Sequence, residues 1–309
     1  MDRLVDALRA LPTTAFLVLD GGEVVFDYGD NAAATYLASA RKSVLSVLFG
    51  DPVASGAIAL DATLGDLGID DIGGLLPGER RATVRDLLTA RSGVYHAAAT
   101  ATGLESSGPP RGSQPPGARF HYNNWDFNVL GTIFERCTGR RVFDALAEDL
   151  AAPLGFEDFD PGRQRLLGRP DRSEHLAHHF FLSGRDLGRV GHLMVRWGRW
   201  GDRQVVPESW VVQSTSVQAD RGLGAALDYG YLWWVPRGLP AGSFLALGNF
   251  GQYLLGVPQL DLVIVHRRAV PEEVVIARSQ SPEPGLPTDG VTPRQFMGLV
   301  RSVIAARRR

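Results

Sequence analysis

The stretch TYLASARKSVLS, residues 35–46, places Ser39 three positions before Lys42, and Lys42 is the only lysine in a 309-residue chain with 32 lysines and arginines in total. Arginine stays protonated in proteins, whereas a desolvated lysine amine can lose its proton and act as a base. Residues three apart on a helix share a face, so a helix beginning near Ser39 brings the two side chains within hydrogen-bonding reach. This spacing predicts a serine nucleophile that attacks a carbonyl carbon while neutral Lys42 accepts its proton.

Each of these residues also has an ordinary structural explanation. Serine is a frequent N-cap, and an arginine-rich composition can leave one surface lysine by chance. A helix N-terminus would nevertheless add positive potential and free N–H groups, which stabilise the oxyanion that an attack by Ser39 creates. Because S-x-x-K is a weak motif by itself, the chemical interpretation depends on further residues.

A second group of candidate residues lies in RFHYNNWDF, residues 119–127, where Tyr122 and Asn124 form a Y-x-N motif. A tyrosine hydroxyl beside a lysine amine can relay a proton to a leaving group, and an asparagine amide can hold a substrate carbonyl or orient the lysine. The alternative for Tyr122 is a half-buried aromatic that anchors a loop. His121 is a candidate supporting residue beside Tyr122. The glycine-rich LGNFGQY, residues 247–253, predicts a turn whose exposed backbone can line a cleft.

The hydrophobic pattern predicts an α+β scaffold for these motifs. Strand patterns occur as a hairpin at residues 15–29 and again after residue 229, and the middle of the chain is mostly helical. We therefore expect an antiparallel β-sheet flanked by helices and formed by both chain ends, residues 1–50 and 180–309. Residues 51–179 would form an inserted helical domain that carries the Y-x-N motif, with the site in the cleft between the two domains. The expected helices cover 1–11, 39–49, 60–72, 82–94, 126–139, 141–155 and 292–308, with one more beginning at Ser183 and a long loop over 100–118.

Composition narrows the class of protein. A net charge of −2 gives no reason to expect a nucleic-acid partner, and no apolar run is long enough to span a membrane. Cys137 is the only cysteine, and the first 16 residues lack an unbroken apolar run, so we expect a cytoplasmic protein without a disulfide. The histidines of HLAHH, residues 175–179, have a helix-compatible metal spacing, but a zinc site needs further ligands. We interpret this segment as a strand or loop entry and expect no metal and no cofactor.

S-x-x-K, Y-x-N and a glycine-rich strand edge, in this order, resemble the serine hydrolases related to class C β-lactamases, penicillin-binding proteins and D-alanyl-D-alanine carboxypeptidases. The similarity extends to TVRDLLTARSGVYH, PGARFHYNNWDFNVLGTIFE and GRWGDRQVVPESWV, so it covers nearly the whole chain. Within this superfamily the chain is most similar to family VIII carboxylesterases and 6-aminohexanoate-dimer (nylon-oligomer) hydrolases. The resemblance implies a β-lactamase/transpeptidase-like fold.

The resemblance also implies roles for individual residues. Ser39 would be the nucleophile, Lys42 the general base and Tyr122 the proton relay to the leaving group. Asn124 would orient the substrate or Lys42. The backbone N–H groups of Ser39 and Gln252 would form the oxyanion hole.

One departure from the family pattern concerns the charge of the substrate. Where relatives carry K-T-G or H-x-G, this chain has Asn249, Phe250 and Gly251, so a cation that can bind a substrate carboxylate is missing. Neutral esters or amides therefore fit better than β-lactams or acyl-D-Ala peptides, unless Arg91 or another arginine replaces the charge.

These observations predict a serine hydrolase that cleaves a small-molecule ester or amide through an acyl-Ser39 intermediate, as a monomer or homodimer. One alternative is an acyltransferase, in which an alcohol or amine replaces water as the acceptor. A second alternative is a non-catalytic binding protein on the same scaffold, because Asn249 stands where relatives have a cation and because fold alone does not establish function.

Overall fold

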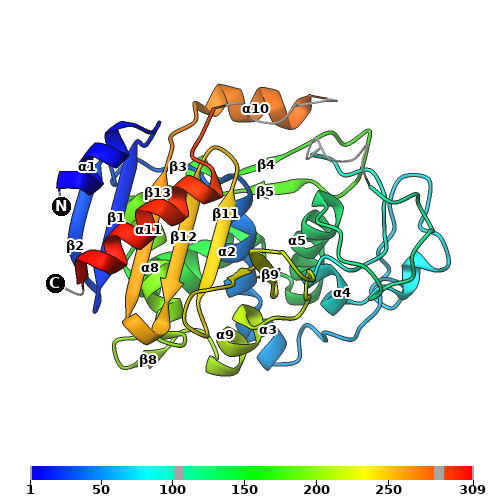
Figure 1. Ribbon diagram of the computed structural model, residues 1–309. Helices are drawn as coiled ribbons and strands as arrows, with labels where there is room; N and C mark the ends of the chain where they lie inside the picture. The colour runs from blue at the N-terminus through cyan, green and yellow to red at the C-terminus, as the bar shows by residue number, and fades with distance from the viewer. Residues whose placement is uncertain (1, 101–107, 282–288, 308–309) are drawn as a thin grey trace.

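The computed structural model describes residues 2–100, 108–281 and 289–307, and its centre is a seven-stranded antiparallel sheet (Figure 1). The strand order is β2-β1-β13-β12-β11-β10-β9. The N-terminal hairpin pairs through β1 with β13, which confirms the prediction that both chain ends build one sheet. The strands of this sheet are β1 (Ala15–Asp20), β2 (Glu23–Gly29), β9 (Leu227–Tyr229), β10 (Trp234–Pro236), β11 (Phe244–Gly248), β12 (Gln252–Val257) and β13 (Leu262–Arg267).

Helices cover both faces of the sheet (Figure 1). The side chains of β1 alternate: Phe16 and Val18 pack with α1 (Asp2–Arg9) and α11 (Pro293–Arg307), whereas Leu17 and Leu19 pack with α8 (Gly184–Val195). Burial on both faces explains why this strand reads as a continuous apolar run rather than as an alternating one. The helices α1 and α11 and the cap of α8 by Ser183, whose side chain accepts from the Asp186 N–H, confirm the predictions for these segments.

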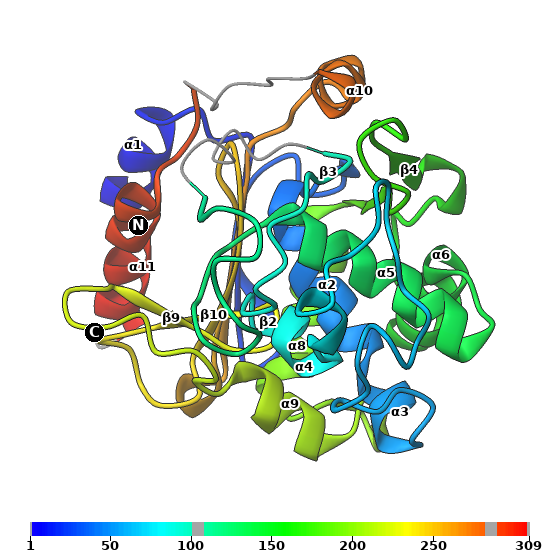
Figure 2. The ribbon, with the colours of Figure 1, turned by 90° about the vertical axis from the view of Figure 1, so that its right-hand side faces the viewer.

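The remaining elements lie mostly to one side of the sheet (Figure 2). The helices are α2 (Arg41–Leu48), α3 (Gly50–Ala54), α4 (Val84–Leu88), α5 (Asn124–Thr138), α6 (Val142–Ala145), α7 (Ala152–Leu154), α9 (Glu208–Thr215) and α10 (Glu272–Gln280). Shorter helical turns are η1 (Ala38–Ala40), η2 (Glu79–Arg81), η4 (Leu146–Ala151), η5 (Pro161–Arg163) and η6 (Pro258–Leu260). Short strand pairs join β3 (Thr35–Tyr36) to β6 (Phe181–Leu182), β4 (Arg165–Leu167) to β5 (Ala177–His179), and β7 (Arg199–Trp200) to β8 (Arg203–Gln204).

Two of the expected helices differ from the structure. Residues 60–72 form turns, because Thr63 and Asp70 side chains bond to nearby backbone N–H groups and compete with a helix. The expected helix 82–94 is helical only over α4, Val84–Leu88, because Ala90 has a φ of 55° that ends it. The helix α2 ends at Leu48, as predicted, and the separate helix α3 begins at Gly50 with Pro52 in its first turn, where a missing N–H costs little. Residues 101–107 of the expected loop lie outside the described residues. The division into a sheet domain and an inserted helical domain stays a prediction.

Candidate active site

Ser39 and Lys42 lie side by side at the start of α2. Ser39 belongs to the turn η1, and the Lys42 Nζ is 3.1 Å from the Ser39 Oγ. Lys42 is buried, at 1% exposure, while Ser39 is partly exposed. A shielded amine therefore contacts a hydroxyl that a substrate can reach, which is the arrangement that nucleophilic catalysis by serine needs.

Tyr122 and Asn124 complete the surroundings of the lysine amine. The Lys42 Nζ lies 2.7 Å from the Tyr122 hydroxyl and 2.8 Å from the Asn124 Oδ1. A hydrogen bond from the Asn124 Nδ2 to the Thr100 carbonyl, 2.8 Å long, fixes the orientation of the Asn124 amide. The structure thus brings together the four residues that the two sequence motifs singled out, although residues 39 and 122 are far apart in the chain.

The electrostatics of this group favour a neutral lysine and a protonated tyrosine. Burial, and then the nearby Arg41, lower the pKa of Lys42 well below its ordinary value. Burial raises the pKa of Tyr122 to about 12. The lowered pKa of Lys42 favours an amine that can accept the Ser39 proton, and the raised pKa of Tyr122 favours a hydroxyl that keeps its proton and can donate it.

The turn that holds Ser39 is under local strain and is tied to the rest of the fold. Ala38, directly before Ser39, has a φ of 48°, which is unfavourable for a residue with a side chain. The Leu37 N–H donates to the Phe180 carbonyl at 3.0 Å, so the strand pair of β3 and β6 continues up to the turn. Strained backbone of this kind is typical of functional sites and persists only where the surroundings hold it.

The end of β11 approaches this turn closely. A Cβ on Gly248 would lie 2.5 Å from the Leu37 carbonyl oxygen and 3.0 Å from the Ala40 nitrogen, so only glycine fits at this position. The register of β10 with β11 consists of one pair, Trp234 with Leu245. The edge of β11 beyond Leu245 is therefore not covered by β10, and its last residues lie beside Ser39.

Three predicted substrate-binding residues form the turn after this edge. Asn249 is exposed and Gly251 is buried. Phe250 has a φ of 69°, and its ring lies 6.0 Å from the Arg268 guanidinium and 5.5 Å from that of Arg278. The position where relatives carry a cation is thus neutral in this chain, but two arginines from other segments flank its aromatic neighbour.

Gln252 has a structural environment that the sequence did not reveal. It pairs with Gly248 in the ladder between β11 and β12, and it is fully buried. Its Oε1 accepts from the Arg267 Nε at 2.7 Å and its Nε2 donates to the Arg268 carbonyl at 2.5 Å. Its side chain therefore serves to hold Arg267, and the role of its backbone N–H in an oxyanion hole stays a prediction.

Aromatic side chains continue the site from Tyr122. The Tyr122 ring stacks on Trp234 at 5.5 Å between centroids, and Tyr229 and Phe120 contact Trp234 from other sides. His121, the predicted supporting residue, packs edge-on against Tyr95 at 5.3 Å. An apolar wall of this type suits the acyl or leaving group of an organic substrate.

Two residues of the site were not singled out from the sequence. Arg41 is 4% exposed and its Nη2 donates to the Asn128 Oδ1 at 3.2 Å, so it faces the interior rather than solvent. Gly248 is recognisable only from its contact with the turn before Ser39. The available signals were an arginine directly before the single lysine and a glycine at the end of an apolar strand, and neither is specific.

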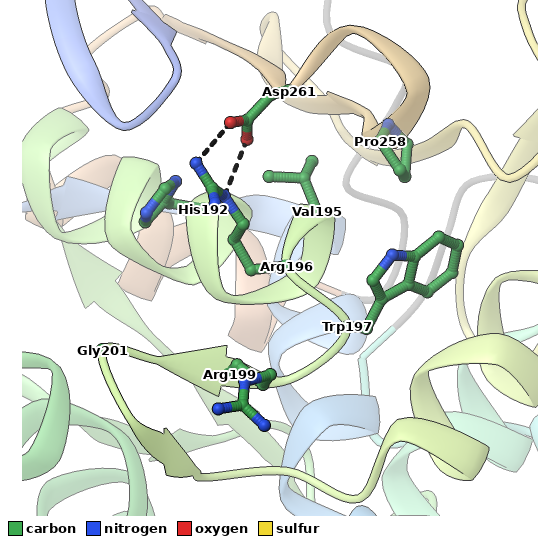
Figure 3. Close-up of a pocket in the computed structure, with 8 residues that line it drawn as sticks. All are labelled: His192, Val195, Arg196, Trp197, Arg199, Gly201, Pro258 and Asp261. Carbon is green, nitrogen blue, oxygen red and sulfur yellow. Dashed lines mark hydrogen bonds and ion pairs between the residues drawn. The ribbon is translucent and has the colours of Figure 1, made fainter.

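A separate hollow of about 570 Å³ lies at the opposite end of β12 (Figure 3). Trp197, Arg199 and Pro258 contribute to its lining, and an ion pair between Arg196 and Asp261 borders it. None of the lining residues is a serine or lysine, so it does not belong to the site at Ser39.

Within the described ranges, no helix has the length and apolar character to cross a membrane, and no set of His, Cys, Asp and Glu is arranged to hold a metal ion. His178 and His179 lie in β5, as the strand interpretation predicted.

Comparison with known proteins gives consistent results. The family model described as Beta-lactamase matches residues 1–266. The 6-aminohexanoate-dimer hydrolase of Paenarthrobacter ureafaciens is 30% identical over 162 residues, which cover 50% of this chain and 40% of that protein. The monacolin J acid methylbutanoyltransferase of Aspergillus terreus is 30% identical over 165 residues, 44% of this chain and 39% of that protein. The matches thus span about two fifths of the length of these two relatives.

Solved structures share the fold over nearly the whole chain. A penicillin-binding protein homologue from Caulobacter crescentus superimposes with a TM-score of 0.65 at 17% identity, covering 99% of this chain and 98% of that one. EstCE1, described as a hydrolase with promiscuous acyltransferase activity, gives a TM-score of 0.64 at 15% identity, covering 97% and 96%. These similarities establish a fold like that of penicillin-binding proteins, as the sequence resemblance implied.

Proposed function

The chain belongs to the Beta-lactamase family, and we propose from this premise that it is a serine hydrolase that cleaves an ester or amide through an acyl-Ser39 intermediate. One observation carries the proposal: the buried Lys42 amine contacts Ser39, Tyr122 and Asn124 at once. This contact set gives the nucleophile both a base and a proton relay.

The proposed acylation begins when the Ser39 Oγ attacks the carbonyl carbon and its proton passes to the Lys42 Nζ. The carbonyl oxygen becomes an oxyanion, and the backbone N–H groups of Ser39 and Gln252 are the proposed donors that stabilise it. As the bond to the leaving group breaks, Tyr122 donates its proton to that group and regains one from Lys42. The products are acyl-Ser39 and a free alcohol or amine.

Deacylation would use the same groups in reverse order. Water gives a proton to the Lys42–Tyr122 pair as its oxygen attacks the acyl carbon, and Ser39 regains its proton when the acid leaves. If an alcohol or amine enters instead of water, the product is a new ester or amide. The methylbutanoyltransferase among the relatives makes acyl transfer a specific second candidate.

For the substrate, we propose a neutral ester or amide of organic acids. The support comes from the exposed, uncharged Asn249 and from the aromatic wall of Tyr122, Trp234 and Phe120. Arg268 and Arg278 near Phe250 favour a second class, substrates with a carboxylate, for which the 6-aminohexanoate-dimer hydrolase provides a relative. Hydrolysis of matched substrates with and without a terminal carboxylate separates these classes.

The test of the proposed function is the intact mass of the protein after incubation with a fluorophosphonate probe. We expect one adduct on the wild-type protein and none on Ser39→Ala. Lys42→Arg, which retains the charge but cannot act as a base, should slow adduct formation by about 10²-fold or more. Folded wild-type protein without an adduct would favour the non-catalytic binding protein, and an adduct on Ser39→Ala would exclude Ser39 as the nucleophile.

A further inference from the structure

Arg41 is a buried cation for which the described part of the chain supplies no acid. It is 4% exposed, and its Nη2 donates to the neutral amide of Asn128 on α5 at 3.2 Å. No Asp or Glu among the described residues lies within ion-pair distance of Arg41, although the same residues form 19 ion pairs between a carboxylate and an arginine or histidine, at distances up to 3.9 Å. A buried guanidinium without a counter-charge is costly, so its position next to the proposed base calls for a physical reason.

The groups that face Lys42 and Arg41 are neutral or positive. Ser39 and Arg41 come from the same helical segment as Lys42, Tyr122 and Asn124 from the start of α5, and Asn128 from one turn further on. From β3 and β5, Tyr36 and His179 stack on each other at 5.3 Å between ring centroids. Burial, and then the charges of Arg41, His178 and Lys42, lower the pKa of His179. Tyr229 adjoins Tyr122 at 6.1 Å.

Hydrogen bonds alone do not decide the protonation state of Lys42. Its three partners can satisfy either an ammonium with three donors or a neutral amine with two donors and one acceptor. The rings of Tyr122 and Phe127, each 4.3 Å from the Nζ, favour the ammonium. Burial and the fixed charge of Arg41 oppose the ammonium form. Because a guanidinium does not lose its proton, the lysine is the group that becomes neutral.

We propose that Arg41 is a positioning residue that keeps Lys42 in its neutral, proton-accepting form by placing an unpaired positive charge beside it. This inference rests on the proposed function for its catalytic meaning, but the protonation of Lys42 can be measured without any substrate. It also gives Asn128 a role: its neutral amide holds the guanidinium without cancelling its charge, as a carboxylate would.

The experiment exploits the single lysine of the chain. Protein labelled with ¹³C-lysine yields one Lys42 side-chain Cε signal, whose chemical shift against pH reports the pKa directly. Four forms are compared: wild type, Arg41→Gln, Asn128→Asp and Asn128→Ser. Aspartate has the same shape as asparagine. Because the Asn128 Nδ2 has no partner among the described residues, replacing this Nδ2 by an oxygen in Asn128→Asp removes no hydrogen bond.

We expect Arg41→Gln, which removes the charge, and Asn128→Asp, which neutralises it, each to raise the Lys42 titration midpoint by about one pH unit or more. Asn128→Ser leaves the charge unpaired and should leave the midpoint near that of wild type. Should Arg41→Gln fail to fold, Asn128→Asp against Asn128→Ser still tests the proposal. A midpoint that is the same in wild type and in both charge-changing variants overturns it.

The reaction rate provides a second readout. For acylation by the fluorophosphonate, the acid limb of the pH–rate profile should move up with the Lys42 midpoint, so that at any pH below the wild-type midpoint the two charge-changing variants lose about tenfold for each unit. Above both midpoints their rates should equal or exceed that of wild type, because a more basic amine is the stronger base. A uniform loss at every pH would show a merely structural role for Arg41. An unreactive wild type would refute the proposed function, while the NMR titration would still decide the role of Arg41.

Discussion

Replacing Asp126 by asparagine should change how the stability of the protein depends on pH. Asp126 is 0% exposed in the first turn of α5, where the Ser92 hydroxyl donates to its Oδ1 at 2.6 Å. Its Oδ2 has no hydrogen-bond partner among the described residues. Burial raises the pKa of this carboxyl to about 8, and the charge of Asp86 contributes in the same direction.

The magnitude follows from proton linkage. Between about pH 4, where an unfolded aspartate titrates, and about pH 8 the folded protein keeps a proton that the unfolded chain has lost. The contribution of Asp126 to the free energy of unfolding is therefore fully present below pH 4 and falls by about 1.4 kcal/mol per pH unit up to the folded pKa. Between pH 5 and pH 7 the loss amounts to about 3 kcal/mol. Asparagine does not titrate, and its Oδ1 can still accept from Ser92.

Urea denaturation at pH 5, 6 and 7, followed by tryptophan fluorescence, measures this effect. The free energy of unfolding of Asp126→Asn minus that of wild type should increase by about 3 kcal/mol from pH 5 to pH 7. The exposed Asp144 supplies the control, because Asp144→Asn should give a difference that varies by no more than about 0.5 kcal/mol. A flat difference for Asp126→Asn would mean that this carboxyl is already ionised in the folded protein, and the electrostatic reasoning for the buried site would be wrong.

Three further predictions concern the site and its support. Tyr122→Phe should slow hydrolysis of an alkyl ester by about 10²-fold or more and that of a nitrophenyl ester much less, since nitrophenolate leaves without a proton; equal losses would argue against a proton relay. Gly248→Ala should reduce acylation and destabilise the fold by about 1–3 kcal/mol in urea denaturation, because its Cβ would lie 2.5 Å from a carbonyl oxygen. Gly78→Ala, with open space around it, is the matched control, and equal effects would contradict this explanation. Gln252→Leu leaves the Arg267 Nε without its acceptor and should cost about 2–4 kcal/mol by the same assay, whereas a neutral effect would show that Arg267 finds another partner.

The fold was predictable where hydrophobic periodicity and turn chemistry agree. The hairpin at Asp20-Gly21-Gly22 has a standard turn sequence between two apolar runs, and the late strands are separated by glycine and proline. The segment 60–72 has apolar residues at helical spacing, but side chains such as Thr63 and Asp70 accept hydrogen bonds from the local backbone and stabilise turns instead of a helix. The hydrophobic pattern does not show which of the two structures forms.

The site divides along similar lines. Ser39, Lys42, Tyr122 and Asn124 could be named as candidates because S-x-x-K and Y-x-N depend on residue type and short spacing, which a sequence shows directly. Their catalytic roles stay predictions. The choice of the second oxyanion donor depends on how the hairpin of β11 and β12 meets the turn at Leu37–Ala40, and that is a tertiary contact. The environment of Arg41 was not predictable, because the lack of an acid around it among the described residues leaves no trace in the local sequence.

Both chain ends contribute to the support of the turn that holds Ser39. Arg267, buried in the C-terminal strand β13, donates from its Nη2 to the Thr35 carbonyl at 2.9 Å and to the Tyr36 carbonyl at 3.1 Å, a pairing of residues up to 232 apart. Its Nη1 donates to the Leu182 carbonyl at 3.1 Å, so one guanidinium holds both strands of the pair that leads into Ser39. Because Ala38 adopts a strained backbone, the turn needs support of this kind to persist. The geometry at Ser39 therefore depends on the contacts of the turn with β13 and β6 and not on the S-x-x-K helix alone, which explains why the motif by itself predicts the chemistry only weakly.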